Sequence, residues 1–114
     1  MNKVAISIVR SGEGLNDRMD DRFGRAQAFL VVDRSTGEVV ETIDNALVSA
    51  SHGAGSGAAN LLKSAGVRAV ISGRFGPNAS DALAALGIEA WLAPPGITAG
   101  EAVRLLRDGA LEQT

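Results

Sequence analysis

The chain has 114 residues, a net charge of −2, 46% hydrophobic residues and no cysteine. Such a length fits one domain with a substantial core, which we expect to span residues 1–114. The acidic balance argues against a nucleic-acid binder, because such proteins carry a basic surplus. No apolar run approaches the roughly 20 residues that cross a bilayer, and no signal peptide precedes the first strand-like segment. We therefore expect a cytoplasmic protein that binds neither nucleic acid nor membrane.

The first half of the chain is predicted to form three strands. Residues 3–9 are rich in valine and isoleucine, which indicates a buried strand. Residues 10–25 are charged and contain glycine, so we expect a loop there. Strands over residues 26–33 and 38–44 flank a tight turn at residues 34–37 and form a hairpin.

The second half is predicted to alternate helices and strands. Apolar spacing predicts a helix over residues 54–65, and Pro77 opens a second helix that continues to Leu86. A capping box at Thr98 and Glu101 starts a third helix. Short apolar strands cover residues 67–72 and 88–93. The resulting order, βββαβαβα, predicts an α/β fold with a mixed sheet of about five strands flanked by helices.

Three glycine-rich segments lie between these elements, at residues 22–25, 51–57 and 73–78. Glycine allows a backbone to approach a ligand closely and to direct its N–H groups toward it. The chain has one histidine, His52, and no cysteine, so it cannot build an ordinary protein-ligated metal site. These segments favour a compact anion held by backbone donors and arginines.

The second segment is the strongest candidate for such a cradle. Gly53, Ala54, Gly55 and Gly57 lie at the start of the first predicted helix, where free N–H groups and the helix dipole favour negative charge. Gly53, Gly55 and Ala58 also fit part of a dinucleotide-binding fingerprint, but no clean strand leads into them and no acid follows at the expected place. The plain alternative is an ordinary loop that enters a helix.

Three side chains near these glycines have two interpretations each. His52 can donate a hydrogen bond to a sulfide or bind copper, or it can be a loop histidine in solvent. Phe23 and Phe75 can form an apolar wall beside a ligand, or they can anchor the core.

Arginines in the first and third segments can supply counter-charge to an anion. Arg22 has Asp20 and Asp21 beside it, and Arg25 is only a few residues away, so both can belong to a solvated face instead. Arg74 has no nearby acid before it or in the next six residues, which makes it the better candidate.

Several short motifs occur in a fixed order along the chain. They are Val4-Ala5-Ile6, Phe23-Gly24-Arg25-Ala26, Gly53-Ala54-Gly55, Gly73-x-x-Gly76-Pro77-Asn78-Ala79, Leu86-Gly87-Ile88 and Glu101-Ala102-Val103 followed by Gly109-x-Leu111. In these motifs the chain resembles the dinitrogenase iron–molybdenum cofactor-binding family over nearly its whole length. Within that family, a short single-domain chain without cysteine is most similar to the orange protein group.

The resemblance implies a ribonuclease H-like fold and a metal–sulfur cluster as ligand. Members of the orange protein group are associated with a molybdenum–copper sulfide cluster, and other members with an iron–molybdenum cofactor. Family members often have histidine where this chain has Arg22, so no metal-ligand role is carried over to that position. The residues expected to contact the cluster are Phe23, Gly24, Arg25, His52, Gly53, Ala54, Gly55, Gly57, Arg74, Phe75, Gly76 and Asn78.

Together these observations predict a protein that binds, carries or stores a preformed molybdenum-containing metal–sulfur cluster without a covalent bond. We expect a monomer that is not an enzyme and that meets cluster-assembly or acceptor proteins. A nuclease is opposed by the predicted strands at residues 3–9 and 67–72, which contain no carboxylate for metal ions. The alternative function is a small enzyme or sensor that binds a nucleotide or phosphate at the first helix.

Overall fold

The computed structural model describes residues 2–45 and 54–114. The strands are β1 (Lys3–Val9), β2 (Arg18–Met19), β3 (Ala28–Asp33), β4 (Val39–Asp44), β5 (Val67–Ser72), β6 (Glu89–Leu92) and β7 (Glu112–Gln113). The helices are the 3-10 helix η1 (Gly14–Asn16) and the α-helices α1 (Ala54–Ser64), α2 (Pro77–Ala85) and α3 (Ala99–Arg107).

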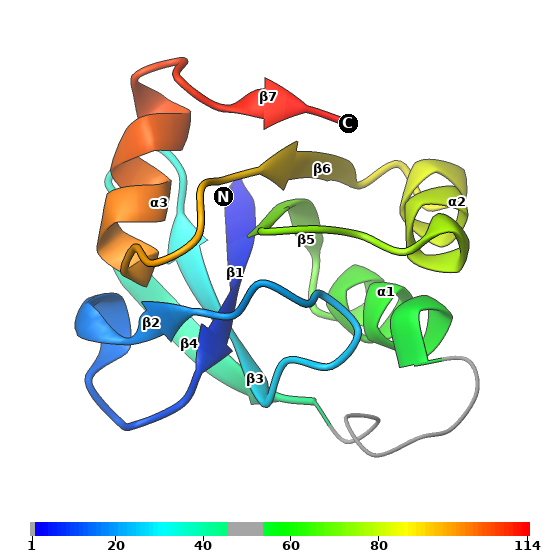
Figure 1. The fold of residues 1–114 in the computed structure, drawn as a ribbon, viewed down its shortest axis with the longest axis horizontal. Coiled ribbons are helices and arrows are strands. Elements are labelled where there is room, and N and C mark those ends of the chain that lie inside the picture. The colour runs from blue at the N-terminus through cyan, green and yellow to red at the C-terminus, as the bar shows by residue number, and fades with distance from the viewer. Residues whose placement is uncertain (1, 46–53) are drawn as a thin grey trace.

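The seven strands form one mixed sheet in the order β4-β3-β1-β5-β6-β7, and β2 pairs with β1 beside this path. β1, β5 and β6 run parallel in the centre, whereas β3, β4 and β7 pair with their neighbours in the antiparallel direction. Figure 1 shows this sheet between its helices. Because the central strands are covered on both faces, β1 and β5 read as nearly continuous aliphatic runs rather than alternating ones.

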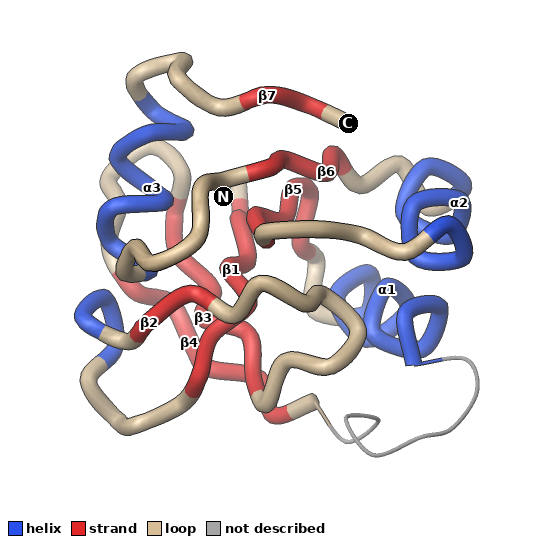
Figure 2. Tube along the Cα trace, in the orientation of Figure 1, coloured by secondary structure: helices blue, strands red, loops and turns tan. Residues whose placement is uncertain are grey.

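Helices cover both faces of the sheet (Figure 2), and one apolar core lies on each face. α1 and α2 lie on one face, where the apolar core includes Phe29, Leu62 and Leu83. α3 lies on the other face, where Val103 and Leu106 pack against the opposite sides of the same strands. Among the described residues, no helix is long and apolar enough to span a membrane.

The predicted α/β class is confirmed, but the expected number of about five strands is wrong. The sheet has two additional strands, β2 and β7, of two residues each. β2 lies in residues 10–25, which were predicted to be a loop. A two-residue strand has no periodicity to detect, and its conformation is set by the strand against which it pairs. The other strand and helix boundaries agree with the predicted ones to within two residues.

The predicted capping box at the start of α3 is present. The Thr98 hydroxyl accepts a hydrogen bond from the Glu101 N–H at 3.2 Å, and the Glu101 carboxylate accepts one from the Thr98 N–H at 3.0 Å. The backbone and hydroxyl bonds from Thr98, with a smaller effect of Arg104, lower the pKa of Glu101. This cap fixes the loop between β6 and α3, which borders the site described next.

Candidate functional site

The first and third glycine-rich segments meet at the carboxyl ends of β1 and β5. The N–H of Phe23 donates to the carbonyl of Arg74 at 3.3 Å, and Arg22 and Arg74 pair as in a short parallel ladder. A Cβ on Gly73 would lie 2.6 Å from Asp21 Oδ1 and 2.8 Å from Asp21 Cα, so only glycine allows the two backbones to come this close. In Figure 1 the segment between β2 and β3 and the segment between β5 and α2 run beside each other.

An open pocket of about 530 Å³ lies beside this junction. Its volume is within the range of about 300–1,000 Å³ that is typical of ligand sites. The lining residues are Val9, Arg18, Met19, Asp20, Asp21, Arg22, Arg74, Pro95 and Gly96. The pocket thus lies outside the carboxyl ends of parallel strands, where open α/β sheets commonly bind their ligands.

The other lining residues come from β2 and from the loop at Pro95, and backbone hydrogen bonds hold both segments in place. β2 pairs with the end of β1, so that Val9 is opposite Arg18. The N–H of Met19 donates to the carbonyl of Ile97 at 2.9 Å, which draws the loop at Pro95 against β2. These pairings bring three segments that are far apart in sequence to one surface.

The lining contains three arginines and two aspartates, so it carries one net positive charge. Asp20 is buried and holds Arg22: its Oδ1 accepts the Arg22 N–H at 2.9 Å and lies 3.7 Å from Arg22 Nε. Arg18 and Arg74 are exposed and form no ion pair within the described residues. Their positive charge is therefore available to an anionic ligand.

Two apolar side chains complete the pocket. Val9 is 42% exposed, which is unusual for a valine at the end of a central strand, and the mostly buried Met19 of β2 also lines the pocket. An arrangement of guanidinium groups beside apolar surface suits an anion that is large and weakly hydrated, because the apolar contact favours its desolvation.

The structure places the two phenylalanines, Phe23 and Phe75, next to each other at the edge of the core. Phe23 is 1% exposed, and its ring lies 5.4 Å from that of Phe29 and 5.3 Å from that of Phe75. Phe75 is half-buried against the same core. Phe23 therefore anchors the first loop to the core, which is the second of the two interpretations given for it, and it has almost no surface left for a ligand.

The remaining predicted site residues in the first and third segments do not line this pocket. Gly24 and Arg25 are half-buried, and the Gly24 carbonyl accepts a hydrogen bond from the Asn45 side chain at 3.3 Å. Gly76 caps the start of α2, with open space around it, and Asn78 is exposed in the first turn of that helix.

The predicted cradle in the second segment lies partly outside the described residues. Ala54, Gly55 and Gly57 fall in the first turn of α1, as the helical spacing predicted, whereas His52 and Gly53 are outside the described part of the chain. The first turn of a helix has N–H groups without partners inside the helix. A ligand role for this segment stays a prediction.

Sequence reasoning missed Arg18, Met19, Pro95 and Gly96. The only local signal for Arg18 and Met19 was the charge of residues 10–25, and the approach of all four residues depends on pairing between distant segments. Residues 2–45 and 54–114 contain no group of three acidic, histidine or cysteine side chains that could hold a metal ion. A metal bound there would have to bring most of its own ligands.

Comparison with known proteins places this geometry in context. The orange protein from Desulfovibrio gigas, solved in its apo form, is 37% identical and superposes with a TM-score of 0.91, covering 100% of this chain and 93% of that one. A Thermotoga protein of the DUF35 family, solved by NMR, is 34% identical with a TM-score of 0.82, covering 99% and 93%. An uncharacterised protein from Methanocaldococcus jannaschii is 33% identical over 100 residues, which are 86% of this chain and 84% of that protein.

The sequence pattern of one family also covers nearly the whole chain. That family is described as dinitrogenase iron–molybdenum cofactor, and its pattern matches residues 2–109. The superpositions on the two solved relatives likewise cover nearly the whole chain. The chain therefore belongs to the dinitrogenase iron–molybdenum cofactor family.

Proposed function

We propose that this protein binds a preformed, anionic metal–sulfur cluster containing molybdenum in the pocket at the carboxyl ends of β1 and β5. The observation that carries the proposal is the pair of exposed arginines, Arg18 and Arg74, which face the pocket without ion-pair partners in the described chain. They stand beside the apolar side chains of Val9 and Met19. Family membership and the orange protein likeness support the same class of ligand.

The donors of the pocket fit a cluster better than a single ion. A cluster brings its own sulfide ligands, so the protein has to supply only positive charge, hydrogen-bond donors and apolar contact. Arginine offers five N–H donors in a planar arrangement and is weakly hydrated, which suits soft, delocalised anions. We propose that the cluster is held without a covalent bond to the protein. We further propose that it is a molybdenum–copper sulfide.

We also propose that the protein is a monomeric carrier or store of the cluster and not an enzyme. The pocket is open to solvent, so an acceptor or assembly protein can reach the bound cluster directly. We also propose that the α/β topology is of the ribonuclease H type, with the nuclease chemistry absent because β1 and β5 contain no carboxylate.

Titration of the purified chain with tetrathiomolybdate and copper(I) tests the proposal. We expect visible absorption that stays with the protein through gel filtration. Arg74→Gln should weaken binding about fivefold, since the contact of an exposed arginine with an anion is worth up to about 1 kcal/mol. Arg22→Gln should weaken it less, because Asp20 already neutralises Arg22.

Arg104→Gln is the matched control, since Arg104 is an exposed arginine on α3 that does not line the pocket. If it weakens binding as much as Arg74→Gln does, the pocket is not the binding site. The alternative function, binding of a nucleotide or phosphate, predicts that ADP binds to the chain and that no coloured complex persists. That pair of results would replace the cluster proposal.

A further inference from the structure

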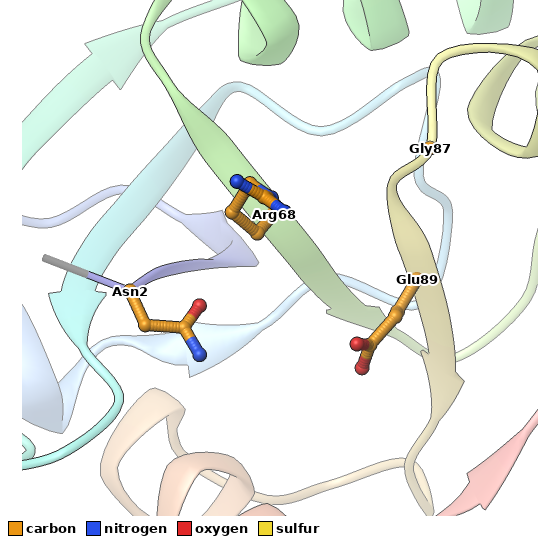
Figure 3. Close-up of a pocket in the computed structure, with 4 residues that line it drawn as sticks. All are labelled: Asn2, Arg68, Gly87 and Glu89. Carbon is orange, nitrogen blue, oxygen red and sulfur yellow. The ribbon is translucent and has the colours of Figure 1, made fainter.

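A second pocket lies at the opposite end of the parallel strands, where β1, β5 and β6 begin. It has a volume of about 410 Å³ and a mainly polar lining formed by Asn2, Arg68, Gly87 and Glu89. Figure 3 shows Arg68 on β5 between Asn2, which precedes β1, and Glu89 on β6. The cluster proposed above does not involve these residues.

A shift in strand register places Arg68 in this pocket. Lys3 of β1 pairs with Val67, but the next residue, Val4, pairs with Ala69, so Arg68 has no partner on β1. Val67 consequently packs in the core beneath α1 and α2, whereas Ala69 packs in the core beneath α3, although a regular strand would direct both to one face. Such an inserted residue reorients its side chain, and bulges of this kind are common beside functional sites.

Two neighbouring side chains fix the carboxylate of Glu89. The indole N–H of Trp91 donates to Glu89 Oε1 at 2.9 Å, and Arg34 Nη1 lies 3.3 Å from the same oxygen. The Arg34 guanidinium in turn lies 5.9 Å from the centre of the Trp91 ring. Both contacts reach one oxygen, so Oε2 remains available to a further donor within the described structure.

Arg68 and Glu89 line the same pocket with opposite charges, yet they form no ion pair with each other. Arg68 is exposed and makes no other ion pair within residues 2–45 and 54–114. A fixed carboxylate and a separated guanidinium at one pocket complement a ligand that carries both charges. Arg34 offsets part of the Glu89 charge, but the free oxygen Oε2 still favours a ligand with an ammonium group over a dianion such as phosphate.

We infer that this pocket binds a small zwitterion of the α-amino acid type. Arg68 takes the carboxylate through paired N–H donors, and Glu89 Oε2 accepts a hydrogen bond from the ammonium group. The side chain of the amino acid extends into solvent, which leaves its identity unrestricted by the four lining residues. The site is independent of the metal–sulfur pocket and does not rest on the function proposed for it.

Amide chemical-shift titrations with four small probes test this inference. Glycine carries both charges, acetate only the carboxylate, methylammonium only the ammonium, and phosphate a different anion. At millimolar concentrations glycine should shift the amides of Arg68, Gly87 and Glu89, and acetate and methylammonium should each bind at least about threefold more weakly. Equal binding of glycine and acetate, stronger binding of phosphate, or no shift at these amides would overturn the inference.

Two variants locate the effect. Arg68→Gln should weaken glycine binding about fivefold, the value expected for an exposed ion pair of at most about 1 kcal/mol, whereas Arg104→Gln should leave it unchanged. Arg68 is exposed, so its replacement leaves the fold intact, which the unchanged spectrum of distant amides verifies. If Arg68→Gln binds glycine as tightly as the parent, Arg68 has no role in the site.

Discussion

The two ends of the central sheet position their arginines by different means. At the carboxyl ends of β1 and β5, hydrogen bonds between backbone groups position the loops that carry the arginines. Phe23 donates to the Arg74 carbonyl at 3.3 Å, and Asp20 donates to the Ser7 carbonyl at 2.8 Å. These backbone bonds hold the loop that carries Arg22 against the end of the sheet, and the buried Phe23 ring adds to them.

At the amino ends of the same strands, side chains hold the site together. The carboxylate of Glu89 is oriented by the side chains of Trp91 and Arg34. One backbone bond, from the main-chain N–H of Arg34 to the Asn2 carbonyl at 2.9 Å, adds to these contacts. The comparison indicates that backbone changes will damage the carboxyl-end pocket, whereas side-chain changes will damage the amino-end pocket. The predictions below test the carboxyl-end half of this comparison and its independence from the amino end, from the largest expected effect to the smallest.

Replacement of Gly73 by alanine should have the largest effect. The new Cβ would lie 2.6 Å from Asp21 Oδ1 and 2.8 Å from Asp21 Cα, so the two loops must move apart. We expect a loss of about 1–3 kcal/mol in the free energy of unfolding, as for other overpacked sites, and a loss of cluster binding. Urea unfolding and the cluster titration measure these two effects.

The neighbouring glycine supplies the control for this experiment. Gly76 has no atom within 4 Å of the position of a Cβ, and its φ of −70° suits any residue. Gly76→Ser should fold as stably as the parent, because serine is a favoured residue at the start of a helix. Glycine binding at the amino-end pocket should survive in both variants, and its loss in Gly73→Ala would show that the two ends are not independent.

The sequence was sufficient for the elements whose signals are local. The aliphatic runs of β1 and β5 and the capping box of α3 contain their own evidence, and the structure reproduces all three. Arg18 could not be found in this way, because its place opposite Val9 depends on pairing between strands separated by a loop. Pairing of this kind is determined by the tertiary fold.

Phe23 illustrates a second limit of sequence reasoning. A phenylalanine next to a glycine in a charged segment is equally compatible with a binding wall and with a core anchor. The contacts of its ring with Phe29 and Phe75 decide for the anchor, and neither contact is visible in the local pattern. The register shift at Arg68 is hidden for the same reason, since it is defined only relative to β1.

Two buried serines at the carboxyl end allow a finer test of the backbone argument. The Ser72 hydroxyl donates to the Asp20 carbonyl at 3.2 Å and ties the loop to β5, whereas the buried Ser7 hydroxyl has no hydrogen-bond partner in the described structure. Ser72→Ala should cost about 1 kcal/mol in the free energy of unfolding. Ser7→Ala should cost nothing or be stabilising, because it removes an unsatisfied buried group.

Thermal and urea unfolding of the two alanine variants, made and measured in parallel, test this contrast. Each substitution removes one buried serine hydroxyl, from β1 or from the neighbouring β5. A difference between their effects on stability therefore reports the hydrogen bond that only Ser72 makes. Equal destabilisation by the two would mean that Ser7 also has a partner, or that the Ser72 bond contributes nothing. Cluster binding should be nearly unchanged in both, since the backbone pairing of Phe23 with Arg74 remains.

The smallest expected effect is on the pH dependence of stability. It arises from Glu101 in the capping box of α3, which fixes the loop at Pro95. Hydrogen bonds from the Thr98 backbone and hydroxyl lower the pKa of Glu101 in the folded protein. Ionised Glu101 therefore stabilises the folded state above the pKa of the unfolded chain, about 4.3 for an ordinary glutamate, and this contribution is lost as the pH falls through the lower folded pKa.

Glu101→Gln should reduce stability at neutral pH, and the difference from the parent should shrink as the pH falls through this window. Thr98→Ala keeps the backbone donor, which is the larger cause of the shift, so part of the pH dependence should persist in that variant. Urea unfolding at a series of pH values measures both differences, and a difference for Glu101→Gln that stays constant with pH would contradict the assigned role of the carboxylate.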